Sequence, residues 1–394
     1  MRTALVLLTT VLLIGAVAAP AAVSGASTHA LDDVALDCSY PMTVTDATGE
    51  ELTIEEPAER IVTTSPSAAN VLWEIGEQDR VVGVTEHAMY LEGAEDRDIV
   101  SDEEGWLDHE LIVEAEPDLV LAPNATGSEE VEQLRDLGLT VYHFHEAKDL
   151  DDVAAKTGVI GELVDACDDA ADTIDWMDER LSIVDEATAN VEPVSAIYLF
   201  FDFTAGADTF IDDLITRAGA DNVAADAGID GYQPISDEVL VNASPEWIIL
   251  NSDDPGLPDS EAVNQTTAAQ EGHVVIVEIE QVNQPAPHTV LAIETMLEHF
   301  HPDAYAATVE AAESDDADAT EADDVEADAD DTAVEADDID GDNGDAVDDG
   351  DDTDDTLTDD TDDVAADDDA LPGFGVAAAL MATLLGVFVL SRRR

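Results

Sequence analysis

Basic residues are scarce in this 394-residue chain, which has 12 Lys and Arg against 95 Asp and Glu and a formal net charge of −83. The sequence contains two lysines, Lys148 and Lys156. This scarcity excludes nucleic acids as partners, because binding their phosphates needs clustered cations. Repulsion among so many carboxylates is screened at molar salt, where the Debye length falls to about 3 Å. The composition is therefore typical of a protein from a salt-adapted organism.

The sequence also lacks the motifs that mark common enzyme classes. It contains no Gly-x-Ser-x-Gly elbow, no P-loop and no Gly-x-Gly-x-x-Gly after a predicted strand. We therefore expect a protein that is not an enzyme.

The N-terminal residues predict export. Met1 and Arg2 precede an apolar run over residues 4–17 and then several small residues, a pattern typical of a secretory signal peptide over residues 1–30. Export leads to an oxidising compartment, where cysteines pair. We therefore expect a disulfide between Cys38 and Cys167, the two cysteines of the chain.

The C-terminal residues predict membrane attachment. An apolar stretch ending at Leu390 is long enough to cross a bilayer, and the arginines after Ser391 fit positive-inside topology. The motif Pro372-Gly373-Phe374 and this context make residues 371–394 resemble the PGF-CTERM sorting signal of haloarchaeal surface proteins. The resemblance implies cleavage by an archaeosortase and a C-terminal anchor on the outer face of the cytoplasmic membrane.

Residues 306–370 form an acidic segment of low complexity. They contain no Lys or Arg and consist mainly of Asp, Glu, Ala, Thr and Val. Such a segment cannot bury enough apolar area to offset its chain entropy. We expect an extended, self-repelling stalk between a globular part and the anchor.

Between these ends, β-branched runs alternate with helical patterns in two series. The alternation predicts two α/β lobes, each with a mainly parallel sheet, over residues 38–148 and 191–305. In the first lobe, strands are expected at 60–64, 80–85, 117–122 and 139–144, with helices at 68–75, 110–115 and 128–137. In the second lobe, strands are expected at 194–201, 247–250 and 273–277, with helices at 209–218, 237–241 and 289–299.

Residues 149–190 separate the two lobes. Apolar residues recur there at spacings of three, four and seven, from Val153 through Ile160 to Val184, and no proline interrupts them. The pattern predicts one long amphipathic helix, which at 1.5 Å per residue would reach on the order of 50 Å. Such a helix would hold two lobes on either side of a cleft.

Several segments together resemble a known family. They are residues 61–76, 80–85, 110–122, 137–141 and 243–250. Their order and spacing are similar to those of the solute-binding proteins of ABC importers for cobalamin, ferric siderophores and haem, the class III group with a helical backbone. The resemblance implies two Rossmann-like lobes joined by a single long α-helix. It also implies a monomer outside the membrane that delivers a small metal chelate to a permease and its ATPase.

Among the ligands that the resemblance implies, cobalamin (vitamin B12) is the first expectation, with ferric siderophore and haem as alternatives. A large flat chelate needs aromatic walls and a few polar groups. Such residues lie on predicted loops after strands, where α/β sheets present ligands, although several of the aromatics would equally suit a core. The candidates are Tyr90, Trp106 and Asn124 in the first lobe and Phe201, Phe203, Tyr232, Asn283 and Gln284 in the second.

The resemblance further implies one acidic residue at the tip of each lobe, pairing with arginines of the permease. Glu129 and Glu130 in the first lobe and Glu238 in the second are the candidates. Each is expected in the first turn of a helix, where the helix dipole favours a carboxylate. The same preference gives these residues a purely structural alternative.

The sequence also allows two functions other than chelate transport. A zinc- or manganese-binding protein would use histidines such as His87, His109, His143, His145 and His288. His143 and His145 share one face of a predicted strand end, but no third ligand lies at a suitable local spacing, so we expect no metal site. A structural surface protein is the other alternative, which the stalk and the anchor alone would allow.

Overall fold

The short apolar runs of the first lobe form one parallel sheet in the computed structural model, which describes residues 36–102, 105–201, 203–312 and 314. The strand order is β5-β4-β3-β6-β7, and every pairing is parallel. The strands are β3 (Ile61–Thr63), β4 (Val81–Val84), β5 (Asp98–Ile99), β6 (Leu119–Ala122) and β7 (Val141–His143). The expected α/β class and parallel sheet are confirmed.

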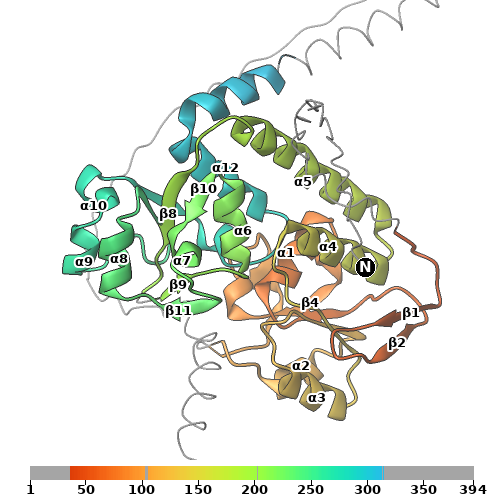
Figure 1. The fold of residues 1–394 in the computed structure, drawn as a ribbon. Helices are drawn as coiled ribbons and strands as arrows, with labels where there is room; N and C mark the ends of the chain where they lie inside the picture. Colours follow the sequence, from red (N-terminus) through yellow and green to blue (C-terminus); the bar gives the residue numbers. More distant parts are fainter. Residues whose placement is uncertain (1–35, 103–104, 202, 313, 315–394) are drawn as a thin grey trace, which may run out of the picture.

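Helices connect these strands and cover the sheet (Figure 1). They are α1 (Pro66–Glu74), α2 (His109–Glu114) and α3 (Ser128–Asp136), with 3-10 turns at η1 (Gln78–Arg80), η2 (Glu86–Ala88) and η3 (Ala94–Asp96). Local chemistry sets where they begin: Pro66 occupies the first turn of α1, and the Asp108 carboxylate caps α2 by accepting from the Glu110 and Leu111 amides. An antiparallel hairpin of β1 (Met42–Thr45) and β2 (Glu51–Ile54), which the sequence did not predict, precedes the sheet.

The second lobe repeats the design with a four-stranded parallel sheet of order β10-β8-β12-β13. Its strands are β8 (Val194–Tyr198), β10 (Ala220–Asn222), β12 (Trp247–Asn251) and β13 (Val274–Val277). A separate antiparallel ribbon pairs β9 (Phe203–Ala205) with β11 (Tyr232–Pro234). The helices are α6 (Phe210–Arg217), α7 (Val223–Asp226), α8 (Asp237–Ala243), α9 (Glu261–Asn264), α10 (Thr267–Glu271), α11 (Ile279–Val282) and α12 (Thr289–Phe300).

Two helices, rather than the single helix expected over residues 149–190, form the backbone between the lobes. They are α4 (Leu150–Val164) and α5 (Cys167–Thr188). The chain reverses at Asp165, which adopts the left-handed conformation at φ 59°. A Cβ on Gly161 would lie against Ala170, and one on Gly158 near Ile174, so the helices run antiparallel. Each helix buries one apolar face, so the helical spacing of apolar residues in the sequence continues from α4 into α5 and did not reveal the turn between them.

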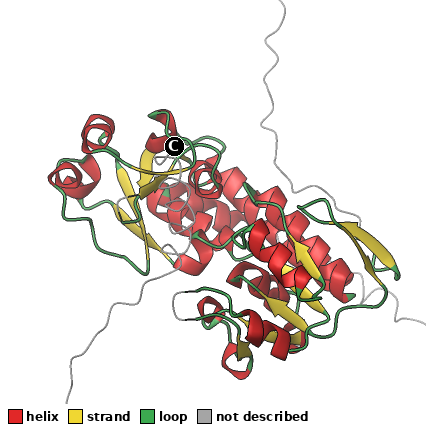
Figure 2. Cartoon of the chain, turned by 90° about the horizontal axis from the view of Figure 1, so that it is seen from below, coloured by secondary structure: helices red, strands yellow, loops and turns green. Residues whose placement is uncertain are grey.

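The helix pair belongs to the cores of both lobes. Leu150 and Val153 at the start of α4 pack in the core of the second lobe, whereas Ile160 and Leu163 near its end pack in the core of the first. In Figure 2 the strands of the two lobes lie on either side of these central helices. With 22 residues, α5 is about 33 Å long. The lobes are therefore joined by a stiff pair of antiparallel helices, which is shorter than the single helix predicted from sequence.

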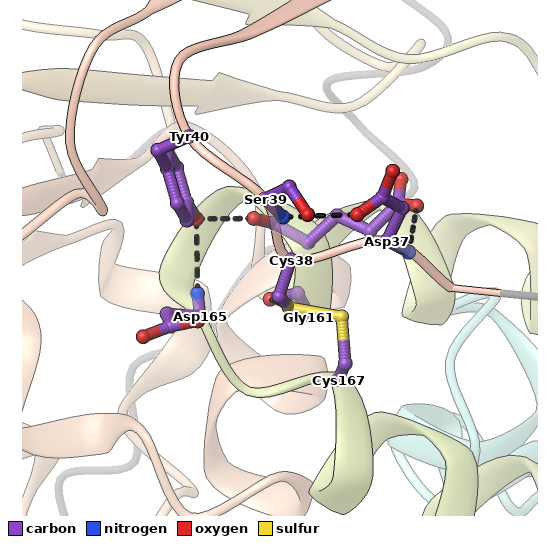
Figure 3. Close-up of a disulfide and its surroundings, with 8 residues drawn as sticks. Asp37, Cys38, Ser39, Tyr40, Gly161, Asp165 and Cys167 are labelled. Atoms are coloured by element: carbon purple, nitrogen blue, oxygen red, sulfur yellow. Dashed lines mark hydrogen bonds between the residues drawn. A yellow bond between two sulfur atoms is a disulfide. The ribbon is translucent and has the colours of Figure 1, made fainter.

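A disulfide fixes the N-terminal segment to the turn between α4 and α5. Cys38 and Cys167 are bonded, with their Cα atoms 6.1 Å apart, as the sequence predicted. Beside this bond, the Tyr40 hydroxyl donates to the Glu162 carbonyl and accepts from the Asp165 amide at 3.1 Å (Figure 3). The bridge spans 129 residues of sequence and holds the reversal of the backbone in place.

The expected ends of the chain lie largely outside the described residues. The signal peptide, the PGF-type sorting signal and most of the predicted stalk fall in the undescribed part. Residues 302–312 are helical, so the second lobe extends beyond the predicted boundary at residue 305. None of the helices in the described part has both the length and the apolar character of a membrane span.

Candidate functional site

A cavity of about 460 Å³ lies between the two lobes and is hereafter called the interlobe cavity. In the first lobe its walls follow the carboxyl ends of β3, β4, β6 and β7. This is where the strand order reverses around β3, the position at which open α/β sheets bind ligands. The lining there includes residues 64–67, 123–127 and 144–147. The second lobe contributes Phe210 at the start of α6, Tyr232 at the start of β11 and residues 282–285 after β13.

Two aromatic side chains face the interlobe cavity from opposite lobes. Trp106 belongs to the first lobe and is 59% exposed, and Tyr232 begins β11 in the second lobe and is 43% exposed. Exposed rings that line one concave surface provide apolar area that a ligand can cover. Phe210 and Val282 add apolar surface from the second lobe. The arrangement suits a broad, partly apolar ligand held between two rings.

Two amides of the second lobe line the interlobe cavity in fixed orientations. The Tyr198 hydroxyl donates to Asn283 Oδ1 at 2.9 Å, and Asn251 Nδ2 donates to the same hydroxyl at 2.8 Å. The Gln284 Oε1 accepts from the Tyr90 hydroxyl of the first lobe at 2.7 Å. Burial raises the pKa of both tyrosines, so both remain protonated donors at neutral pH. The polar groups of this wall are therefore pre-oriented.

The eight ligand-binding residues predicted from sequence divide into two groups. Those lining the interlobe cavity are Trp106, Asn124, Tyr232, Asn283 and Gln284. Outside the lining, Tyr90 bridges the lobes through Gln284, and Phe201 lies half exposed at φ 48° against Phe200. Phe203 begins β9 and pairs with Pro234 in the ribbon that carries Tyr232.

Lys156 is a cavity residue that sequence analysis did not single out. It lies on α4, lines the interlobe cavity, and is only 8% exposed. Its ammonium donates to the Pro285 carbonyl of the second lobe, and burial lowers its pKa to about 7. The signal was present in the spacing, because Lys156 follows Val153 by three residues and precedes Ile160 by four. That placement puts it on the apolar face of the helix.

The histidines proposed for a metal site are dispersed. His143 is buried with Nε2 3.0 Å from the Thr126 carbonyl, His109 pairs with Glu130, and His288 pairs with Glu74 at 2.9 Å. No group of three or more potential metal-ligating His, Cys, Asp or Glu side chains occurs among the described residues. His87 and His145 line the interlobe cavity. Burial lowers the pKa of His87, so its imidazole is neutral at pH 7.

The acidic residues predicted to dock a permease occupy the expected helix starts. Glu129 and Glu130 lie in the first turn of α3 and line the interlobe cavity, so they face the ligand space as well as solvent. Glu238 lies in the first turn of α8 and is exposed. The three carboxylates are therefore distributed over both lobes. Glu129 and Glu130 were predicted at the tip of the first lobe, and the structure also places them at the cavity.

Similarity to known proteins covers both lobes. The sequence matches the family described as periplasmic binding protein over residues 61–279, more than half of the chain. A cobalamin-binding protein of Halobacterium salinarum is 37% identical over 277 residues, covering 67% of this chain and 75% of the relative. An uncharacterized ABC transporter substrate-binding lipoprotein of Bacillus subtilis is 25% identical over 278 residues, covering 68% of this chain and 87% of the relative.

Solved structures share the fold. The apo periplasmic haem-binding protein of Roseiflexus sp. RS-1 matches with a TM-score of 0.58 and 23% identity, covering 63% of this chain and 99% of that protein. The periplasmic vitamin B12-binding protein of Vibrio cholerae matches with a TM-score of 0.55 and 23% identity, covering 62% and 97%. Because the family match covers more than half of the chain and the Halobacterium salinarum relative is 37% identical over two thirds of it, the chain belongs to the periplasmic binding protein family and serves as a solute-binding protein.

Proposed function

We propose that this protein captures cobalamin or a closely related corrinoid in the interlobe cavity and delivers it to the permease of an ABC importer. The observation that carries the proposal is the pair of exposed rings, Trp106 and Tyr232, which face one cavity from opposite lobes. A corrin is a broad ring with apolar faces, and two aromatic walls suit it. The Halobacterium salinarum relative, described as cobalamin-binding, supports the choice of ligand.

The proposal also includes the place and the partners of the protein. It acts outside the cytoplasmic membrane, tethered through residues 371–394 after archaeosortase processing, and it works as a monomer. Glu129, Glu130 and Glu238 contact the permease, whose associated ATPase drives transport. The exposed position of Glu238 on the second lobe supports this role.

Ligand titration in molar KCl tests the proposal. The panel contains cyanocobalamin, a ferric hydroxamate, haemin, zinc and manganese, with thermal unfolding and calorimetry as readouts. A true ligand stabilises the folded chain by about 2.7 kcal/mol at a hundredfold excess over its Kd. If only haemin or the ferric chelate stabilises the protein, that compound replaces cobalamin as the proposed ligand. If no compound does, a structural surface protein becomes the favoured interpretation.

Matched variants locate the binding site. Trp106→Ala and Tyr232→Ala should each weaken cyanocobalamin binding about tenfold or more, because each removes one wall of the interlobe cavity. Leu137→Ala serves as the control, since Leu137 is 53% exposed at the end of α3 that lies away from the cavity. Unchanged affinity in both aromatic variants would place the ligand elsewhere.

A further inference from the structure

The walls of the interlobe cavity carry little positive charge. Of its lining residues, Lys156 is the one Lys or Arg in the described part, whereas Glu129, Glu130 and Glu146 are acidic. These carboxylates disfavour an anionic ligand group at the short distances that salt does not screen. Attraction of an anion into this cavity must therefore come from a local cation in a weakly screened position.

The Lys156 ammonium is incompletely paired. An ammonium has three donors, and the described residues supply one acceptor, the Pro285 carbonyl. No ion pair joins Lys156 to a carboxylate of the described part, although carboxylates far outnumber cations in this chain. Burying a charged group without a counter-ion costs several kcal/mol. Burial accordingly lowers the pKa of Lys156. The wall of the ligand space thus contains an amine whose charged form has no counter-ion among the described residues.

The arginines of the described part have structural partners. Arg80 pairs with Glu59 and Glu77, Arg135 with Asp46, Arg180 with Glu294, and Arg217 with Asp213. Arg60 donates to backbone carbonyls, and Arg97 pairs with Asp79. Lys148 is exposed. Lys156 differs from all of these because it is buried, lines the interlobe cavity and has no carboxylate partner among the described residues.

We propose that Lys156 is a ligand-binding residue that pairs with an anionic oxygen group of the bound chelate. This inference rests on the proposed capture of a corrinoid and specifies which part of the ligand the cavity recognises. In cobalamin the group is the phosphodiester of the nucleotide loop. In haem the equivalent group would be a propionate carboxylate. The cavity therefore discriminates between chelates that carry such a group and chelates that lack it.

Calorimetric titrations with two corrinoids test this pairing. Cyanocobalamin carries the phosphodiester, and dicyanocobinamide lacks the entire nucleotide loop. Lys156→Met should weaken cyanocobalamin binding at least tenfold and leave dicyanocobinamide binding within about twofold. Lys156→Gln should do the same while retaining a donor for the Pro285 carbonyl. Lys148→Met is the matched control and should leave both affinities unchanged.

The remaining outcomes separate this proposal from the capture of corrinoids itself. Undiminished cyanocobalamin binding by folded Lys156→Met and Lys156→Gln would overturn the pairing and leave capture intact. An equal loss for both corrinoids would also overturn it, because Lys156 would then act only by holding the Pro285 segment. If wild-type protein binds haemin instead of corrinoids, corrinoid capture fails. In that case Lys156→Met should weaken the binding of haemin but not of haem dimethyl ester, which lacks the free propionate carboxylates. Any other result would overturn the pairing.

Discussion

Lys156 links the folding stability of the ligand-free chain to pH. Its pKa is about 7 in the folded protein against 10.5 for an ordinary lysine. Between these values the unfolded chain binds more protons than the folded chain, so the free energy of unfolding rises with pH. We expect wild-type protein to gain stability from pH 7 to 9, with a slope contribution of up to about 1.4 kcal/mol per pH unit. Lys156→Met should lack this contribution.

Chemical denaturation in molar KCl at pH 7, 8 and 9 measures this slope. The difference between wild type and Lys156→Met isolates the lysine from other titrating groups. Lys148→Met should follow wild type, since Lys148 is exposed. Parallel pH profiles for wild type and Lys156→Met would show that the ammonium is not buried in solution.

Asp46, unlike Lys156, is a buried charged group with several partners. Its buried carboxylate accepts from the Thr48 amide and hydroxyl and from the His143 amide at 2.7–3.1 Å, and it pairs with Arg135. Burial alone would raise its pKa, but these hydrogen bonds outweigh burial and lower it. Asp46→Asn should cost about 2–4 kcal/mol at pH 7, because one charged acceptor serves several donors.

The cost of Asp46→Asn should depend on pH. A lowered folded pKa means that the contribution is present above the ordinary aspartate pKa of about 3.9 and is lost as pH falls through the lower folded value. Denaturant titrations at pH 7 and near pH 3 should therefore show the gap between wild type and variant closing. Asp136→Asn, at an exposed position, should change stability little at either pH. A gap that persisted unchanged near pH 3 would contradict the ionic role.

At the scale of elements, the contact between α4 and α5 depends on a glycine. A Cβ at position 161 would lie 2.4 Å from the Ala170 Cβ, closer than carbon atoms approach. Gly161→Ala should therefore push the helices apart and lower the free energy of unfolding by about 1–3 kcal/mol. Gly256→Ala is the matched control, because nothing lies within 4 Å of its added Cβ and its backbone is not left-handed. Thermal unfolding measures both, and equal stability of the two variants would refute close packing.

Much of the element structure was predictable because the strands are short, apolar and β-branched. Strands β3, β4, β6, β7, β8, β12 and β13 lie where the sequence placed them. The two-residue β5 and the three-residue β10 were missed because such short runs give no period. The break at Asp165 was also missed. Its left-handed backbone and the nearby Gly158 and Gly161 mark a reversal, but neither interrupts the apolar spacing.

The candidate site was predictable in part for a similar reason. Loops after strands converge at one edge of a parallel sheet, so Asn124, which follows β6, could be placed from order alone. Tyr232 was placed through the family resemblance, and it reaches the cavity from an antiparallel ribbon. Phe201 and Phe203 satisfied the same rule, yet a turn and a ribbon direct them elsewhere. Lys156 was missed because it comes from a helix between the lobes, and its position in the cavity depends on how α4 packs.

In the whole molecule, one segment of the second lobe adds hydrogen bonds between the lobes to the connection that α4 and α5 provide. Residues 284–288 follow α11 and reach the first lobe and α4 at several points. Gln284 accepts from Tyr90, Pro285 accepts from Lys156, and His288 bonds Asn70 at 3.1 Å. The same segment lines the interlobe cavity through Gln284 and Pro285. The same residues therefore line the cavity and bond the first lobe or α4, so we expect release of a ligand and separation of the lobes to be coupled.

Tyr90→Phe tests that coupling, because it keeps the ring and removes only the hydroxyl that donates to Gln284. Gln284 is 5% exposed, so its oxygen would lose a bond that water cannot easily replace. We expect the contact between the lobes to weaken by about 1 kcal/mol, and cyanocobalamin to dissociate about fivefold faster in stopped-flow displacement. Tyr305→Phe, in the helical residues 302–312 outside the cavity lining, should leave the rate unchanged. An unaltered rate in Tyr90→Phe would mean that ligand release proceeds without separation of the lobes.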